Sequence, residues 1–418
     1  MPSNVVIGAR TQLLYTEETT WGTTPTTPNM REMRFTSLTL NPGRSLIESS
    51  EYVSTRSTPA PGQGTPFPGF SIGVEYQAKT LGTLIKHLLT DTTTVVTTTY
   101  PGTVDLSSGA NVTGLFLVLN DSGTGVTTVT FDGVNPVAAA DLATDINTAV
   151  GTNVATVNAS NQLTLYPSTS GPGGYVKVYS TTSSTVLTEI GWSARTEWNY
   201  TRLKASRDLL EGLSFEVGFT DRSLYSIFTG SKLNSISTEI SPNALVTGSF
   251  EFLARSGGED WTGATSAASI IQDFSPKFDS FNGELLVDGV AEARLRSISW
   301  SVSNNMEEDF QTVYTAFRDS LPEGQRSVNG SIQVKLDNTD WVDRARNFTQ
   351  TAISVKMENT SVNDNRFMRI IFPATRIQLP SFDVPPNAVS LPIDFIAHND
   401  DGGEETDVIY EIGSGEAL

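Results

Sequence analysis

The stretch Arg34-Phe35-Thr36-Ser37-Leu38-Thr39-Leu40 returns later in the chain as Arg294-Leu295-Arg296-Ser297-Ile298-Ser299-Trp300, with the same alternation of polar and apolar positions. The offset of 260 residues, from position 34 to position 294, also relates residues 71–76 to residues 331–336. Chance rarely keeps one spacing over so long a stretch. The sequence therefore predicts that one domain occurs twice, and duplicated modules are typical of structural proteins that assemble through repeated surfaces.

A second, smaller offset relates the ends of the two repeats. Phe228 corresponds to Phe372, Lys232 to Arg376, and residues 242–244 to residues 386–388, all 144 positions apart. The first repeat therefore carries 116 residues, the difference between the two offsets, that the second repeat lacks. We place this insertion at residues 91–205.

The composition excludes several classes of function. Of 418 residues, 38% are hydrophobic and 17% charged, and Gly, Ser and Thr are plentiful, which favours short strands and turns. With no cysteine and two histidines, disulfides, thiolate metal sites and a zinc centre are not expected, and no cofactor is implied. A net charge of −19 argues against a surface that grips nucleic acid. No segment has the pattern of a secretion signal or a membrane span, so we expect a soluble protein.

The segments outside the repeats differ in composition. The Thr/Pro stretch at residues 23–28 disfavours helix, so the N-terminus is expected to form an extended arm that reaches a neighbour. The expected organisation is an N-terminal arm (1–33), a first repeat domain (34–90 and 206–255), an inserted accessory module (91–205), a linker and first strand (256–290), a second repeat domain (291–398) and an acidic C-terminal tail (399–418).

Each repeat shows the same order of local patterns. A strand is followed by a long interval of mixed polarity, to about residue 69 in the first repeat and through residues 306–324 in the second, and each interval is predicted to form a long hairpin. Such a hairpin is longer than a small sandwich needs and must find cover from another chain. A second strand and a short amphipathic helix follow, the helix marked by Leu84 and Leu88 in the first repeat and by Trp341 and Phe348 in the second.

The insertion has its own pattern. Two strands (115–119 and 126–131), a helix (138–150) and three strands (154–157, 163–166 and 175–179) predict a compact α+β module. This order resembles the small accessory modules that decorate phage tail sheaths and flagellar hook or cap proteins.

Catalytic chemistry is not expected. The chain shows no phosphate-binding loop, no nucleophile elbow and no nucleophile with a histidine partner at a usable spacing. Glu48 with Glu51, or Glu307-Glu308-Asp309, could act as acid and base in a sugar-cleaving cleft, but acidic clusters on strand-rich surfaces are usually solvated faces. The acidic run at residues 400–405 lacks the alternating ligands of a calcium loop and is interpreted as a tail.

Two stretches carry a resemblance to a known family. Residues 8–25, Gly8-Ala9-Arg10-Thr11-Gln12-Leu13-Leu14-Tyr15-Thr16-Glu17-Glu18-Thr19-Thr20-Trp21-Gly22-Thr23-Thr24-Pro25, followed by residues 33–36, look like the opening of tail tube proteins of long, non-contractile-tailed bacteriophages. Ser301-Val302-Ser303-Asn304-Asn305-Met306-Glu307-Glu308 resembles the same family. The match covers most of the chain outside the insertion.

The resemblance implies both a fold and a function. The fold is mainly β: two tandem tube domains, each a sandwich or half-barrel with one short helix and a long β-hairpin, plus the inserted α+β module. Hairpins of neighbouring domains join into a β-barrel around a channel through which DNA leaves the capsid. Since most members form six-membered rings from one domain, this duplicated chain is expected to form homotrimeric rings that stack head to tail into a tube. The family also implies tape-measure, terminator and distal tail proteins as partners, a place in the virion tail, and synthesis in the host cytoplasm.

Particular residues follow as candidates for this role. DNA carries one negative charge per ~1.7 Å of duplex, so an acidic channel wall would let it pass without binding. We predict that Glu48, Glu51, Glu307, Glu308 and Asp309 include lumen-facing residues, with a solvated outer face as the alternative. Tyr15 and Trp21 are candidates for contacts of the N-terminal arm with a neighbouring subunit.

Two other functions remain open. A surface adhesin or tail fibre of tandem β-sandwiches, with the insertion binding a cell-surface ligand, would be an elongated monomer or a fibrous trimer. A polysaccharide-degrading tail spike would need a carboxylate pair in a cleft and long repeated coils of parallel strands.

Overall fold

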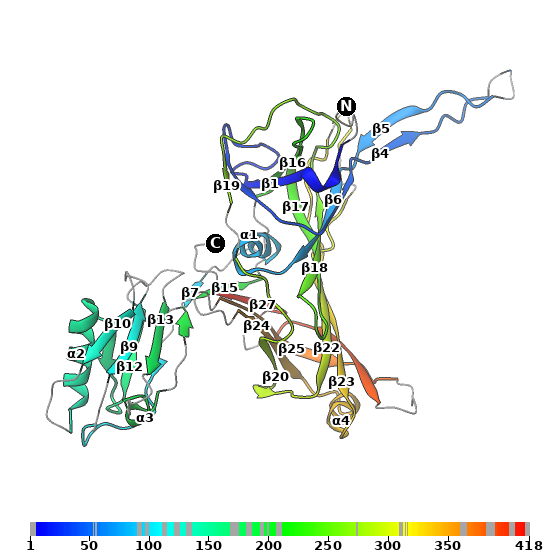
Figure 1. Cartoon of the computed structure of the whole chain (residues 1–418). Coiled ribbons are helices and arrows are strands. Elements are labelled where there is room, and N and C mark those ends of the chain that lie inside the picture. The colour runs from blue at the N-terminus through cyan, green and yellow to red at the C-terminus, as the bar shows by residue number, and fades with distance from the viewer. Residues whose placement is uncertain are drawn as a thin grey trace. The chain divides into compact units, whose positions relative to one another are not determined.

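The computed structural model shows a mainly β chain with a few short helices, which confirms the predicted fold class (Figure 1). The chain forms two compact units. The first comprises Met1–Thr92, Lys204–Met357 and Ile370–Tyr410, and the second comprises Thr93–Leu203, Glu358–Arg369 and Glu411–Leu418. The residues described are 6–52, 54, 57–89, 94–96, 100–110, 115–120, 126–130, 136–167, 175–180, 186–192, 196–198, 200–205, 211–272, 275–308, 312–313, 315, 317–359, 366–381, 389–400 and 406–413.

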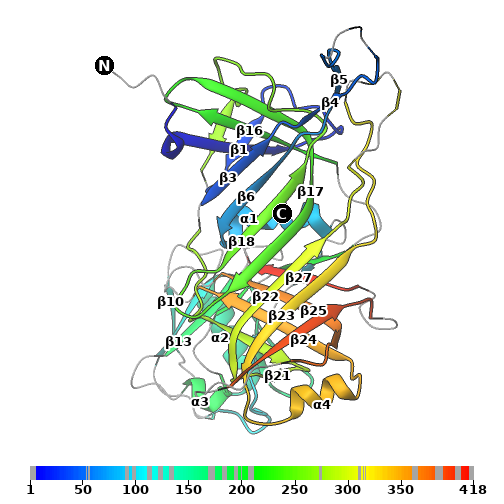
Figure 2. The same cartoon turned by 90° about the vertical axis from the view of Figure 1, so that its right-hand side faces the viewer.

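One antiparallel sheet runs through the regions predicted as the first and second repeats and is called the central sheet below. Its strands pair in the order β3, β6, β18, β17, β22, β23, β26, β25, and most of them lie side by side in Figure 2. The two repeats meet where β17 pairs with β22, from Ser235 opposite Ser303 to Ile240 opposite Ile298. The bounds are β3 (Ser37–Asn41), β6 (Gly69–Glu75), β18 (Thr247–Leu253), β17 (Leu224–Ile240), β22 (Leu295–Ser303), β23 (Ser327–Lys335), β26 (Ser390–Ala397) and β25 (Phe367–Ile377).

One face of the central sheet is the core face. Side chains alternate between the two faces of a strand, and the buried apolar positions follow this period of two. The helices α1 (Ala78–Leu89) and α4 (Asp340–Arg346) lie where the apolar stripes predict them, and α1 contacts β17. Members of this core include Phe70, Ile72, Leu84, Ile85, Phe250, Ile298, Trp341 and Ile393.

The first half of β17 belongs to a second group of strands. It pairs with β16 (Leu213–Phe219), which pairs with β1 (Thr11–Glu17); β1 pairs with β2 (Asn29–Glu32), and β2 runs parallel to β19 (Ser269–Ile271). The strand changes partners at Gly230, where φ is +60° and a Cβ atom would lie 2.8 Å from Cβ of Arg255. Only glycine fits this backbone without strain.

The two intervals that were predicted as hairpins differ. In the first repeat, β4 (Arg44–Ile47) pairs with β5 (Gly62–Pro66), and this hairpin projects from the first unit (Figure 1). In the second repeat, the described residues between β22 and β23 form no strand. They pack on the first repeat, with Met306 and Leu321 buried against Leu253. Tertiary contacts therefore replace hairpin pairing in this interval, which we call the 304–326 segment.

Further strands complete the first unit and extend into the C-terminal region. β20 (Gly283–Val287) pairs with β21 (Val290–Ala291) and β24 (Thr351–Glu358), and the turn η1 (Gly8–Arg10) precedes β1. The region expected as an acidic tail contains β27 (Ile409–Gly413), because Ile409 and Tyr410 supply apolar surface that the core buries. The Tyr410 hydroxyl accepts a hydrogen bond of 3.2 Å from Trp300 Nε1.

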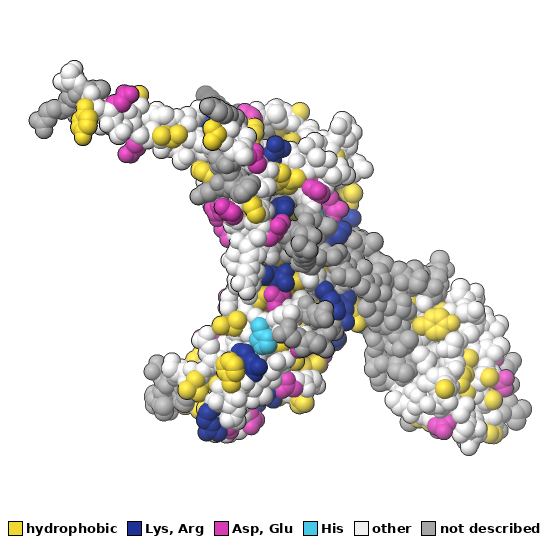
Figure 3. Space-filling model, turned by 180° about the vertical axis from the view of Figure 1, so that it is seen from behind, with side chains coloured by type: hydrophobic (Ala, Val, Ile, Leu, Met, Phe, Trp, Pro, Cys, Tyr) yellow, Lys and Arg dark blue, Asp and Glu magenta, His cyan; other side chains and the backbone are white. Residues whose placement is uncertain are grey.

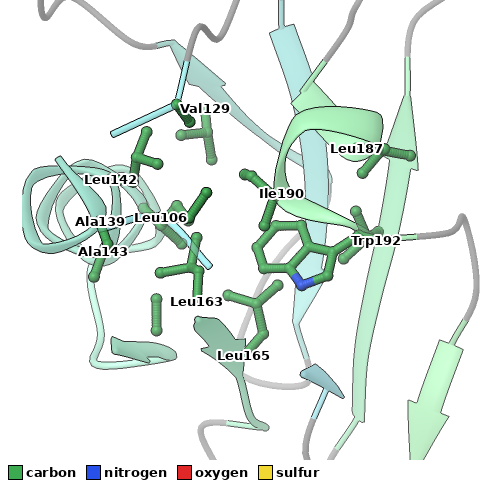
Figure 4. Packing of buried hydrophobic residues seen from close by; sticks show 14 of the residues in the cluster. Leu106, Val129, Ala139, Leu142, Ala143, Leu163, Leu165, Leu187, Ile190 and Trp192 are labelled. Atoms are coloured by element: carbon green, nitrogen blue, oxygen red, sulfur yellow. The ribbon is translucent and has the colours of Figure 1, made fainter. Parts of the chain in front are cut away.

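The second unit contains the insertion, whose six predicted elements occur in the predicted order, while β8, α3 and β14 were not predicted. The helices α2 (Ala139–Val150) and α3 (Val186–Ile190) share a core with the strands, in which side chains such as Leu142, Leu163 and Trp192 converge (Figure 4). One sheet has the order β10 (Val126–Thr130), β9 (Leu115–Asn120), β13 (Tyr175–Ser180), β14 (Thr196–Trp198), and another β11 (Ala155–Val157), β12 (Leu163–Leu165), β8 (Tyr100–Pro101). β7 (Thr94–Val96) pairs with β15 (Tyr200–Lys204), so the two ends of the insertion lie side by side.

Candidate assembly and channel surfaces

The face of the central sheet opposite the core carries short polar side chains. In one row across the strands, Ser37 lies opposite Gly73, then follow Ser249, Ser237, Ser301 and Asn329, and the row reaches Ile396. From position 297 to position 303 of β22, the residues on this side are serines, at positions 297, 299, 301 and 303, while Arg296 Nη1, next to the irregularity at Leu295, donates to Ser390 Oγ on the same side. Because these positions share a face, both repeats contribute to one surface, which we call the serine face.

The serine face is hollowed and bears scattered charges. A hollow of about 600 Å³ has Ser237, Ser301 and Ser331 among its lining residues, with Glu239 and Asp394 beside them. Glu239 accepts a hydrogen bond of 2.6 Å from Ser241 Oγ, and Glu251 accepts one of 2.9 Å from Ser235 Oγ. Two separated cations lie on this side as well: Lys335, opposite Ser390, and Arg376, opposite Ile396. Hydroxyls and separated carboxylates hold water well, but they offer no array of cations that would retain a polyphosphate.

The serine face was not predicted, although the sequence contains a signal for it. The four alternating serines of β22 were used only to align the repeats. Strict alternation of serine with Ile298, Trp300 and Val302 is the pattern of a strand with one wet and one buried face.

The acidic candidates lie outside the central sheet. Glu48 and Glu51 are exposed in the segment that joins β4 to β5, and Glu307 and Glu308 are exposed in the 304–326 segment. Asp309 lies outside the described residues. The assignment of these five residues to a channel stays a prediction, since it depends on neighbouring subunits.

The arm candidates pack within their own chain, which differs from the expectation of a free arm. Tyr15 is buried in β1, and its ring centroid lies 5.8 Å from that of Phe215. Trp21 Nε1 donates to the Gly230 carbonyl at 3.0 Å, and Arg255 lies over the Trp21 ring at 5.3 Å. The physical reason is the run Leu13, Leu14 and Tyr15, whose apolar surface is buried when β1 pairs with β16.

A buried carboxylate fixes the segment that follows β1. Glu18 accepts hydrogen bonds from Ser214 Oγ at 2.6 Å, from Gly230 N at 2.8 Å and from Gly22 N at 2.7 Å. A buried charge is tolerated when donors surround it in this way. Glu18 therefore has a structural explanation and is no candidate for catalysis.

The described residues include no group of three or more His, Asp or Glu side chains that could hold a metal ion. A search of the described helices for one long and apolar enough to cross a membrane finds none.

A long antiparallel sheet with one buried face and one hydroxyl-lined face defines a mainly β protein. The profile of the family described as phage tail tube protein matches residues 8–412, and the chain belongs to this family. No curated protein matches the chain. The protein is thus a structural component of a phage tail and the family is not one of enzymes, which confirms the resemblance on residues 8–25 and 301–308.

Proposed function

We propose that the chain polymerises into the phage tail tube as stacked rings of three copies, each copy supplying two tube domains, around a channel that conducts the genomic DNA. The observation that carries this proposal is the ladder between β17 and β22, which joins the two repeats edge to edge in one continuous sheet. A ring needs the same junction again between molecules.

Strand registers support two copies of one domain. Leu38 lies opposite Ile72, and Ile298 lies opposite Ile332, so both partners move by 260 positions. Leu233 lies opposite Phe252, and Ile377 lies opposite Phe395, which are shifts of 144 and 143 positions. Two sequence repeats that folded differently would not be expected to keep equivalent cross-strand partners.

The junction between the two repeats of one chain suggests how neighbouring molecules pair to close the ring. By these registers β22 corresponds to β3, and β25 corresponds to β17. Because residues 235–240 at the end of β17 pair with β22 of the second repeat, the equivalent junction places the end of β25 and the residues that follow it in one molecule beside β3 of the next. Pairing of this kind satisfies the exposed groups of both sheet edges, and a head-to-tail contact that closes by rotation gives a ring.

The serine face is the channel wall in this proposal. The opposite face of the sheet is covered by α1 and the core, so it points outward. Hydroxyls and separated acids such as Glu239 and Asp394 let DNA slide through hydration water without specific binding. Glu48, Glu51, Glu307, Glu308 and Asp309 are proposed to include further acids that face this channel. Stacked rings contact other tail proteins, with tape-measure, terminator and distal tail proteins as the partners.

Imaging of the purified protein tests the proposal directly. Negative-stain electron microscopy is expected to show stacked rings with a central channel and three-fold symmetry. Dispersed elongated monomers or fibres would overturn the proposal and favour an adhesin or tail fibre.

A single introduced thiol tests the channel wall, since the chain has no cysteine. In assembled tubes, Ser301→Cys is expected to react with a small maleimide but to be protected from a maleimide on a polymer too large for the channel. In dispersed chains it should react with both. Ser160→Cys, at an exposed site in the insertion, is the control and should react with both reagents in both states. Equal reaction of the two variants with the large reagent in tubes would contradict the assignment.

A further inference from the structure

The 304–326 segment of the second repeat is seated on the first repeat by specific contacts. Met306 and Leu253 are each only 6% exposed and belong to one buried cluster. The Met306 amide donates to Asn234 Oδ1 at 3.0 Å, and Asn304 Nδ2 donates to the Leu88 carbonyl at 3.0 Å. Each of these contacts joins a residue of one repeat to a residue of the other.

The registers assign a counterpart to each partner. The offset of 260 holds on both sides of the interval, so Met306 corresponds to Leu46 and Leu88 to Phe348. Leu253 lies opposite Lys232, and Ile396 lies opposite Arg376, so Leu253 corresponds to Ile396.

The counterparts of these buried residues are exposed. Leu46 is 69% exposed, Ile396 45% and Phe348 68%, whereas Met306, Leu253 and Leu88 are buried. Leu46 lies on the projecting β4–β5 hairpin, along which Figure 3 shows exposed hydrophobic side chains, and Ile396 and Phe348 lie on the second repeat. Exposed apolar side chains that gather on one surface mark contact sites. One half of the contact is thus uncovered on the hairpin, and the other half on the second repeat.

We propose, resting on the ring assembly above, that the base of the β4–β5 hairpin seats on the second repeat of the next copy of this chain, with Leu46 packed on Ile396 beside Phe348. The occupant is another copy, because the chain already contains the same contact between its own repeats. The Arg376 guanidinium lies 4.7 Å from the Phe348 ring and borders the docking site.

The docking contact differs from the internal one in its charges. Inside the chain, Lys232 Nζ lies 2.9 Å from Glu323 Oε1 at the edge of the contact. Their counterparts are Arg376 and Gln63, so the carboxylate is replaced by an amide. The contact between molecules therefore lacks this carboxylate, and Arg44, the counterpart of Asn304, is paired with Glu259 of its own chain at 2.8 Å, so the contact should persist at high salt concentration.

A pair of introduced cysteines tests this contact. In the variant Leu46→Cys with Ile396→Cys, mild oxidation of assembled protein is expected to link neighbours, so that non-reducing gels shift from single chains to covalent dimers and trimers. The matched control is Ile47→Cys with Ile396→Cys. Ile47 is also exposed, but it points to the other side of the strand and corresponds to Glu307, which is exposed in the internal contact. The control should stay single-chained under the same oxidation.

Imaging the same samples separates two kinds of failure. If tubes form and Leu46→Cys with Ile396→Cys links no faster than the control, the docking contact is overturned while the tube function stands. If the unsubstituted chain forms no rings, the tube function is overturned, and the contact with it.

Charge substitutions give a second readout that needs no disulfide. Both Leu46→Asp and Ile47→Asp should keep the circular dichroism spectrum of the unsubstituted chain, because both sites are exposed in the single molecule. Leu46→Asp is expected to raise the protein concentration needed for tube formation by about tenfold or more, while Ile47→Asp leaves it unchanged. The same threshold for both variants would overturn the proposal.

Discussion

At the scale of single residues, Arg318 holds the 304–326 segment on the first repeat. Its guanidinium is 1% exposed, and Nη1 donates to the Pro68 carbonyl at 3.1 Å and to the Ala254 carbonyl at 2.9 Å. Phe67 lies beneath it, with Cζ of Arg318 5.5 Å from the ring centroid. Pro68 precedes β6 and Ala254 follows β18, so one side chain binds the ends of two neighbouring strands.

We expect Arg318→Met to lower the free energy of unfolding by about 2–4 kcal/mol, because two buried carbonyls lose their donor while the apolar stem is kept. Urea unfolding followed by tryptophan fluorescence measures this change. The control is Arg346→Met, whose guanidinium is mostly exposed and pairs only with Asp343 three residues away among the ion pairs described, and it should change the value by less than about 0.5 kcal/mol. Equal midpoints for the two variants would contradict the role of Arg318.

At the scale of elements, β1 is tied to the last turn of α1 through Glu17. His87 Nε2 lies 3.3 Å from Glu17 Oε1, and Lys86 Nζ lies 3.4 Å from the same oxygen. The hydrogen bond from His87, with smaller help from Lys86, lowers the pKa of Glu17 from 4.5 to about 2 against the opposing effect of burial. This pair fastens the N-terminal strand to the helix.

The lowered pKa has a defined consequence for stability. Since the folded value lies below the unfolded one, the contribution is present above pH 4.5 and is lost as pH falls toward about 2. In the Glu17→Gln variant, the free energy of unfolding should therefore fall less steeply as the pH drops through this window. The difference from the unsubstituted chain should be less than about 1 kcal/mol, because the Glu17 side chain is half exposed. Urea unfolding at a series of pH values checks the effect, and parallel profiles for the two proteins would count against it.

At the scale of the whole molecule, the insertion is built to be separable. Its core residues lie between Leu106 and Trp192, so it buries its own apolar surface. Thr94 pairs with Arg202 across β7 and β15, so a short turn can join the two strands once the residues between them are removed.

We predict that a chain in which a short turn replaces residues 97–199 still forms tubes, because the serine face, the β4–β5 hairpin and the edges of the central sheet lie outside this range. Negative-stain images should show the same spacing between rings and a smaller outer diameter of the tube. Loss of tubes in a variant that remains folded would show that the insertion takes part in assembly.

The local periodicity of apolar residues in the sequence predicted much of the fold. The alternation in residues 294–300 and its match at residues 34–40 predicted β22 and β3, and the apolar stripe at Leu84 and Leu88 predicted α1. Six elements of the insertion were predicted for the same reason, whereas the short β8, α3 and β14 have too few residues to show a period. These features depend on near neighbours in the sequence, which one sequence displays.

Features that depend on distant partners were not predictable in this way. Arg318 donates to carbonyls about 250 and 64 residues away, and no sequence pattern around Arg318 indicates these partners. Tyr15 was expected to serve a neighbour, but its ring is buried beside Phe215, two hundred positions later. The polar interval 304–326 matched its hairpin-forming counterpart in length, yet it carries Met306 and Leu321, which the first repeat buries.

The ladder between β17 and β22 has a consequence for the kinetics of growth. If six domains close a ring, fusion of the domains in pairs makes every second seam intramolecular. For such a seam, the covalent link between the two domains gives an effective concentration of the order of millimolar, independent of the protein concentration in the cell. Ring formation then depends on the encounter of three bodies instead of six. The two domain types can also diverge, so that each seam of the ring, tethered or free, is tuned by its own residues.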